Sequence, residues 1–97
     1  MNEIQIKIQL VQYLRGKHPN AIYACEVPFA FGERRADVVM LKDGMAHVFE
    51  IKSAGDCVDR LLYQIEGYKK FFDFCHVVGE PSNLDHIRRI VPKDIGF

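Results

Sequence analysis

The sequence has no surplus of charge of either sign, no long apolar run and no recognisable leader. Its 97 residues carry 13 Lys+Arg and 13 Asp+Glu, so the formal net charge is zero. Nucleic-acid binders usually carry a basic excess, so such binding here would need a local basic patch. No apolar run reaches the roughly 18 residues of a transmembrane helix, and the N-terminus lacks a basic-then-apolar signal. The sequence therefore predicts a cytoplasmic protein with no membrane partner.

Patterns typical of zinc, disulfide or nucleotide sites are also missing. Cys25, Cys57 and Cys75 are odd in number and form no C-x-x-C pair, which predicts reduced thiols acting as small core residues. The four histidines share no H-x-x-x-H spacing. The glycines form no phosphate-binding loop, so no nucleotide cofactor is expected.

The composition is that of one small globular domain spanning residues 1–97. Hydrophobic residues make up 48% of the chain and charged residues 27%, which are ordinary values for a folded protein. A chain of this size buries only about 60–65% of the surface that its unfolded form exposes. Association with a second copy would add buried surface, so we expect a homodimer.

The first apolar segment fits two patterns. Alternation over residues 4–10 favours a strand, whereas a second set recurs at helical spacing and runs longer, up to Gly16. The helical set consists of Ile4, Ile8, Val11 and Leu14. We therefore predict a helix over residues 3–16 with this set on its apolar face.

The rest of the chain predicts an α/β fold. Expected are strands over 21–31, 36–41, 46–51 and 74–78, helices over 57–72 and 82–90, and the start of an edge strand at 95–97, where the chain ends. Asp43-Gly44, between two β-rich runs, is a strong hairpin signal. The order α-β-β-β-α-β-α predicts a mixed central sheet flanked by helices.

The hairpin brings two carboxylates together. If Asp43-Gly44 is the two-residue turn, Asp37 lies opposite Glu50, and Lys52 lies on the same face as Glu50. Opposed like charges destabilise a sheet, so this arrangement needs a reason. A divalent metal would supply one, because hard oxygen ligands suit Mg²⁺, or Mn²⁺ in its place. The alternative is a strand-end ion-pair network that includes the neighbouring arginines.

These residues match a known pattern. Arg35-Ala-Asp37, followed by Glu50-Ile-Lys52-Ser53, resembles the PD-(D/E)-x-K nuclease superfamily, with Ala36 in place of the usual proline. The resemblance implies a restriction-endonuclease-like core. It is nearest to a subgroup of small bacterial and phage members and is related to the virus-type replication-repair nuclease branch.

The resemblance also implies roles for individual residues. These are Asp37 and Glu50 as metal ligands, the Ile51 carbonyl as a third ligand, Lys52 as the catalytic lysine and Gln64 as an accessory polar residue. Glu3 or Glu26 could be an extra acid, and neither spacing nor periodicity chooses between them. Gln64 could equally be a plain helix-surface residue, and Glu3 a solvated acid in the first helical turn.

The basic residues closest to the proposed site would bind phosphates. They are Arg34, Arg35, Arg60 and, as an extension, Lys17. The resemblance then implies a Mg²⁺-dependent, structure-selective DNA endonuclease of repair, recombination or phage replication, with RNA not excluded, in the cytoplasm of a bacterial or phage-infected cell. The alternatives are a non-cleaving nucleic-acid-binding module or partner subunit, and a pure interaction domain.

Overall fold

A computed structural model describes residues 2–30, 32, 34–53, 61–80, 85 and 87–89. The elements within them are α1 (Glu3–Lys17), β1 (Ile22–Phe29), β2 (Arg34–Lys42), β3 (Met45–Lys52), α2 (Leu61–Lys69) and β4 (Phe74–Gly79). None of the helices among these residues is long and apolar enough to cross a membrane.

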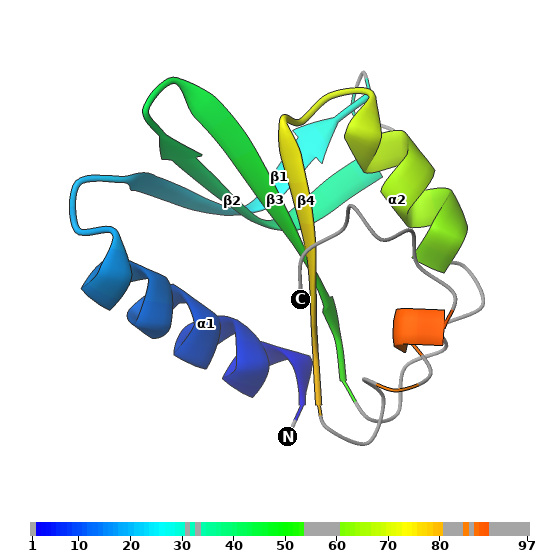
Figure 1. Cartoon of the computed structure of the whole chain (residues 1–97), viewed down its shortest axis with the longest axis horizontal. Helices are drawn as coiled ribbons and strands as arrows, with labels where there is room; N and C mark the ends of the chain where they lie inside the picture. The colour runs from blue at the N-terminus through cyan, green and yellow to red at the C-terminus, as the bar shows by residue number, and fades with distance from the viewer. Residues whose placement is uncertain are drawn as a thin grey trace.

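The four strands form one mixed sheet in the order β1-β2-β3-β4. The first three strands are antiparallel neighbours, and β4 lies parallel to β3. A parallel neighbour requires a crossover connection, and α2 lies within it. Figure 1 shows α1 and α2 on opposite sides of the sheet. The prediction of an α/β fold with a mixed sheet and flanking helices is therefore confirmed.

The β2–β3 hairpin has the predicted register. Lys42 pairs with Met45, and the pairing continues to Val38 and Phe49. The two turn residues have positive φ values, 53° at Asp43 and 75° at Gly44. A tight hairpin turn of this kind needs positive φ at both positions, and Asp-Gly adopts it at little cost.

Side chains cap the N-terminus of helix α1, and a backbone hydrogen bond closes its C-terminus. Asn2 and Gln5 form a reciprocal capping box at the N-terminus. At the other end, the His18 N–H donates to the Leu14 carbonyl at 2.7 Å. The helix therefore extends one residue beyond Gly16, which does not stop it as predicted.

The apolar face of α1 differs from the prediction. Ile4 and Ile8, expected to pack on the sheet, are 66% and 53% exposed. Ile6 and Leu14 are buried instead. Isoleucines at positions 4, 6 and 8 give the helix two apolar faces, so spacing alone does not identify the packed one.

Each face of the sheet carries its own core. The α2 side holds Ala36, Val39, Val48, Leu61, Ile65, Tyr68, Cys75, Val77 and Ile87. The α1 side holds Ile6, Leu14, Val38, Met40, Phe49 and Ile51. Because β2 and β3 contribute to both cores, they are covered on both faces, as their continuous apolar sequence predicts.

Helix α2 ends at Lys69, before the predicted residue 72. The Lys70 N–H donates to the Gly67 carbonyl, and the Phe71 N–H donates to the Tyr68 carbonyl. These i→i−3 bonds tighten the last turn and end the helix. Phe72 then packs against the α2-side core.

Several predictions lie wholly or partly outside the described residues. They concern the start of the second helix at 57–60, Arg60, Cys57, most of the helix over 82–90 and the strand over 95–97. Of the other two cysteines, both free thiols, Cys75 is buried as expected. Cys25 is exposed, so its prediction as a core residue is wrong, because β1 is an edge strand with one open side.

The two faces of α1 can be distinguished by matched substitutions. We expect Ile6→Ala to lower the free energy of unfolding by about 2–4 kcal/mol, because it leaves a cavity in the α1-side core. Ile8→Ala removes the same atoms from an exposed site and should cost less than about 1 kcal/mol. Urea denaturation of both variants measures the difference, and equal losses would contradict the assigned face.

Candidate functional site

The Asp37 carboxylate lies where β2 and β3 separate. Backbone pairing between these strands ends at Val38 and Phe49. One step further along, the Asp37 Oδ2 accepts a hydrogen bond from the Ile51 N–H at 2.9 Å. A side chain thus takes the place of a backbone acceptor at this point, and the buried β3 amide keeps its partner.

Glu50 is the most buried carboxylate of this group, with 3% of its surface exposed. Its side chain lies against the Asp37 carboxyl, and the hydrogen bond between the two raises the pKa of Glu50. The Tyr68 hydroxyl donates to the Glu50 Oε2 at 3.1 Å, and the Lys52 Nζ lies 4.0 Å from the Oε1. The predicted juxtaposition of Asp37, Glu50 and Lys52 is therefore present in the structure.

Burial is the main cause of an unusually high pKa at Glu50. It raises the pKa of Glu50 far above its ordinary value, and the hydrogen bond and negative charge of Asp37 raise it further. Lys52 and Tyr68 act in the opposite direction but do not cancel the effect. Burial also raises the pKa of Tyr68, so its hydroxyl stays protonated and donates to Glu50. Glu50 therefore holds its proton to a higher pH than an exposed glutamate does.

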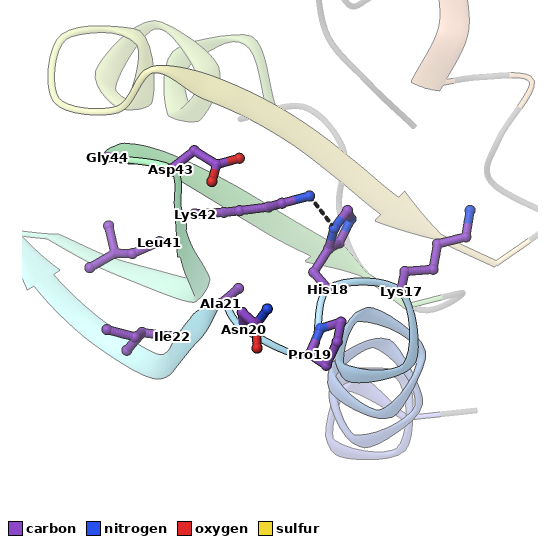
Figure 2. Close-up of a pocket in the computed structure, with 10 residues that line it drawn as sticks. All are labelled: Lys17, His18, Pro19, Asn20, Ala21, Ile22, Leu41, Lys42, Asp43 and Gly44. Carbon is purple, nitrogen blue, oxygen red and sulfur yellow. Dashed lines mark hydrogen bonds between the residues drawn. The ribbon is translucent and has the colours of Figure 1, made fainter.

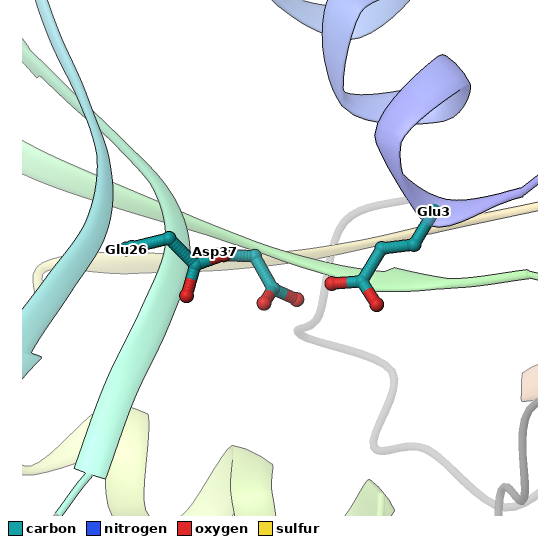
Figure 3. Close-up of side chains that lie close together, drawn as sticks. All are labelled: Glu3, Glu26 and Asp37. Carbon is teal, nitrogen blue, oxygen red and sulfur yellow. The ribbon is translucent and has the colours of Figure 1, made fainter.

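A second acidic group adjoins the first on the α1 side. Carboxylate oxygens of Glu3, Glu26 and Asp37 all lie within 4.8 Å of one another. Figure 3 shows Asp37 between the other two side chains. The sequence did not show whether Glu3 or Glu26 would be the extra acid. In the structure both side chains lie close to Asp37. We call these three residues the acidic cluster.

Backbone geometry and one lysine position the acidic cluster. Glu26 has a φ of 52°, and it interrupts the regular pairing of β1 with β2, which resumes at Val27 and Ala36. The Lys7 Nζ lies 2.6 Å from the Glu26 Oε1 and offsets one of the negative charges. Without Lys7, charge repulsion among the Glu26, Asp37 and Glu3 carboxylates would disfavour this packing.

The donor set of the acidic cluster fits a hard divalent cation better than the Asp37–Glu50 pair does. Oxygen atoms of its three carboxylates converge, and oxygen ligands suit Mg²⁺. In the Asp37–Glu50 pair, by contrast, burial holds the pKa of Glu50 far above its ordinary value, which favours a proton there. The Ile51 N–H, not its carbonyl, makes the contact with Asp37 that the structure records.

Gln64 lies on α2, one turn before Tyr68, so both face the same region. Its Oε1 atom is buried and has no hydrogen-bond partner among the described residues. A buried, unsatisfied amide oxygen is costly, so Gln64 is not a plain surface residue.

The predicted basic residues do not form one patch. Arg34 and Arg35 lie on β2, upstream of Asp37. Lys17 lies in the last turn of α1, about 21 Å of helix away from Glu3 in the first turn. The structure therefore brings the two arginines near the carboxylates and leaves Lys17 at the far end of the helix, while Arg60 is outside the described residues.

Sequence reasoning missed two participants. Tyr68 was expected only as an apolar position of the second helix, yet its hydroxyl satisfies Glu50. Lys7 was not singled out, although it follows Glu3 by four residues and so shares its helix face. Its salt bridge to β1 spans 19 residues of sequence, and no local pattern predicts such a contact.

Comparison with known proteins identifies a family. The family described as "Bacteriophage P4 protein cII" matches residues 1–97, the whole chain. Protein cII of Enterobacteria phage P4 is 31% identical over 98 residues, an overlap covering 99% of this chain. The same overlap covers 37% of that protein, so the chain spans little more than a third of its relative.

Two solved structures share the fold. A protein of unknown function from Silicibacter pomeroyi, SPO1766, superposes with a TM-score of 0.69 and 18% identity, covering 96% of this chain and 60% of that one. Protein VC1899 from Vibrio cholerae superposes with a TM-score of 0.57 and 21% identity, covering 86% of this chain and 25% of that one. At these identities the likeness concerns the fold alone.

The family match corrects the predicted activity. It places the chain with a phage protein cII and not with a nuclease family, so the predicted structure-selective DNA endonuclease of repair, recombination or phage replication is wrong. The contacts of Glu50 are consistent with this correction, because a buried hydrogen-bonded pair serves the fold as it stands. The individual roles that the nuclease resemblance implied for Asp37, Glu50, Lys52 and Gln64 stay untested predictions.

The protonation of Glu50 predicts how stability depends on pH. Its pKa rises from 4.5 to about 9 on folding, so the folded state holds the proton more tightly than the unfolded state. The contribution of Glu50 to the free energy of unfolding should therefore be fully present below pH 4.5 and be lost as the pH rises toward 9. Denaturant titrations across this range, with a chelator present, measure the slope.

A neutral isostere should remove this slope. Glu50→Gln keeps an acceptor for Tyr68 but cannot ionise, so the fall in stability that is due to Glu50 should be missing over the same pH window. Glu66→Gln alters an exposed carboxylate of α2 and should retain the wild-type slope. Equal slopes in the wild type and Glu50→Gln would contradict the assigned protonation.

Proposed function

We propose that this chain, which belongs to the bacteriophage P4 protein cII family, binds DNA without cutting it, in the cytoplasm of an infected cell. The proposal concerns this domain and not the whole of a longer relative, because the chain spans 37% of the phage P4 protein. It rests on a surface of arginine, lysine and aromatic side chains beside α2.

One contact carries the proposal. The Arg34 guanidinium lies over the Tyr63 ring, 4.0 Å from its centroid. Both residues line a hollow of about 390 Å³ together with Lys70, Phe71 and one acid, Glu66, so the cations of the lining outnumber its acid by two to one. Tyr63 and Phe71 are 60% and 51% exposed. Surfaces that bind nucleic acid combine cations for the phosphates with aromatic rings on which bases stack.

Gly67 holds the arginine in this position. A Cβ atom at Gly67 would collide with the Arg34 guanidinium, so the missing side chain creates the place where that group lies. Glycine within a helix costs about 1 kcal/mol relative to alanine. The close approach of Arg34 gives a reason for this cost, because an arginine held in place loses less entropy when it binds a phosphate.

The charge distribution supports a local interface on a neutral chain. Arg34 and Arg35 lie on the same strand as Asp37, within about 10 Å of chain length. Cations and acids are thus separated along β2, and the zero net charge is the sum of a basic and an acidic region. DNA would contact the basic region through its phosphates.

We also propose that the acidic cluster holds Mg²⁺ or Mn²⁺. Glu3, Glu26 and Asp37 would be the ligands, because their carboxylate oxygens converge within 4.8 Å of one another. When bound, the ion would relieve carboxylate repulsion and offer open positions to a phosphate oxygen.

We also propose a fold group and an oligomeric state for this domain. The mixed sheet and the Asp37, Glu50 and Lys52 positions are compatible with a restriction-endonuclease-like core that serves binding instead of cleavage. A homodimer would cover apolar surface that one copy leaves exposed, such as Ile4 and Ile8.

The Arg34 contact can be tested without loss of stability. Arg34→Ala should lower affinity for a labelled DNA duplex about tenfold and reduce the slope of log affinity against log salt by about one. Gly67→Ala should weaken binding similarly by displacing Arg34, while its free energy of unfolding stays equal or rises.

Arg15→Ala is the matched control, because it removes an exposed arginine from α1 and should leave binding unchanged. Fluorescence anisotropy measures affinity, and gel analysis of the same samples with Mg²⁺ should show intact DNA. Unchanged affinity in both Arg34→Ala and Gly67→Ala, or metal-dependent cutting, would contradict the proposal.

The cation site is tested separately. Calorimetric titration with Mn²⁺ should show saturable binding to the wild type and at least a tenfold loss in Asp37→Asn, which keeps an acceptor for the Ile51 N–H. Asp43→Asn, in the hairpin turn, should bind as the wild type does. Equal affinity in the two variants would remove Asp37 as a ligand.

A further inference from the structure

A second hollow lies at the opposite end of α1 from the acidic cluster. Its volume is about 450 Å³, within the usual size of small-molecule sites. It lies among the last turns of α1, the β2–β3 hairpin and the start of β4. The lining includes Tyr13, Lys17, Lys42, His47, Phe74 and His76.

Four aromatic rings form a continuous stack along the α1 side of the sheet. Phe74 and His47 have centroids 4.6 Å apart, with planes 20° from parallel. His47 and His76 follow at 5.4 Å and 10°, and His76 and Phe49 at 4.7 Å and 17°. All four rings line the hollow, and they alternate between β4 and β3. The neighbouring rings cover both faces of His47 and His76, so a flat aromatic ligand meets the edges of these two rings and packs on them edge to face.

The two histidines form a neutral pair. The His47 Nδ1 and the His76 Nε2 lie 3.1 Å apart, so one ring donates a hydrogen bond and the other accepts it. Burial lowers the pKa of both imidazoles below the ordinary value, which keeps them uncharged at neutral pH. An uncharged pair can pack its ring edges against a heterocyclic base and exchange hydrogen bonds with it.

Two lysine side chains, Lys17 and Lys42, lie beside the ring stack. Lys17 and Lys42 line this hollow and also a neighbouring one of about 530 Å³, so they lie where the two adjoin. Figure 2 shows Lys42 bonded to His18, at 2.7 Å between Nζ and Nδ1, with Lys17 close by. Asp43 is the one acid among the residues that line either hollow. The lysines therefore leave a positive excess suited to an anion.

We propose that this hollow binds a nucleoside monophosphate, with its base against the edges of the His47 and His76 rings and its phosphate near Lys17 and Lys42. An apolar ligand would leave the excess positive charge of the two lysines unbalanced, and a free phosphate would leave the ring edges unused. A free nucleotide and the end of a nucleic-acid strand both offer the required chemistry. The site goes beyond the proposed duplex binding and shares none of its residues.

Ligand affinities test the chemistry of the site. Calorimetric titrations at pH 7.5 would use AMP, GMP, CMP and UMP, each alone, with adenosine and inorganic phosphate as partial ligands. We expect at least one nucleotide to bind at least tenfold more tightly than either partial ligand. Absence of saturable nucleotide binding, or equal affinity for inorganic phosphate, would overturn the proposal.

Matched variants test the location. Lys17→Glu should lower nucleotide affinity at least tenfold, whereas Arg15→Glu makes the same charge change in the same helical turn, at a residue outside the hollow, and should not. His47→Val, which suits a strand, should weaken both adenosine and nucleotide. Should it fail to fold by circular dichroism, the two helix variants still decide. Equal affinities in Lys17→Glu and Arg15→Glu would overturn the assignment.

A final experiment distinguishes a free nucleotide from the end of a nucleic-acid strand as the ligand. A six-nucleotide single strand with a terminal phosphate should also depend on Lys17. Tighter binding of the strand than of the nucleotide supports a strand end as the ligand, and weaker binding supports the free nucleotide. Arg34→Ala should keep full nucleotide affinity, so loss of duplex binding and failure of this site are separable outcomes.

Discussion

The hydrogen bond from the Ile51 N–H to the Asp37 carboxylate is the contact on which this fold depends. It lies where β2 leaves β3, and it satisfies an amide that would otherwise be buried without a partner. The same carboxylate bonds Glu50, which bonds Tyr68 of α2, and approaches Glu3 of α1. One side chain thus links the sheet to both helices.

Burial dictates the chemistry of this link. Two carboxylates cannot both stay ionised in contact inside a protein, so a proton or a cation must join them. For Glu50, burial raises the pKa and the Tyr68 hydroxyl donates a hydrogen bond, whereas in the acidic cluster on the α1 side Lys7 lies against Glu26. A pair of acids followed by a lysine is therefore compatible with a structural network, which is why the sequence pattern alone did not establish the activity.

Local signals predicted much of the fold. Asp43-Gly44 determined the hairpin register, and with it the approach of Asp37 to Glu50. The packed face of α1 was not predictable, because isoleucines occur on two faces of that helix. The contacts of Arg34 with Gly67 and of His47 with His76 join residues about 30 positions apart, and only the tertiary arrangement of strands and helices brings them together. Neither contact could be predicted from residue type or spacing.

The account rests on a protonated Glu50 hydrogen-bonded to Tyr68, and carbon-13 NMR of its side-chain carboxyl measures this protonation directly. Titrated without divalent metal, the Glu50 carboxyl signal should keep the shift of a protonated acid through pH 7 and change only well above its ordinary pKa of 4.5. A carboxyl that ionises near pH 4.5 in the folded protein would contradict the network and with it the structural role of this pair.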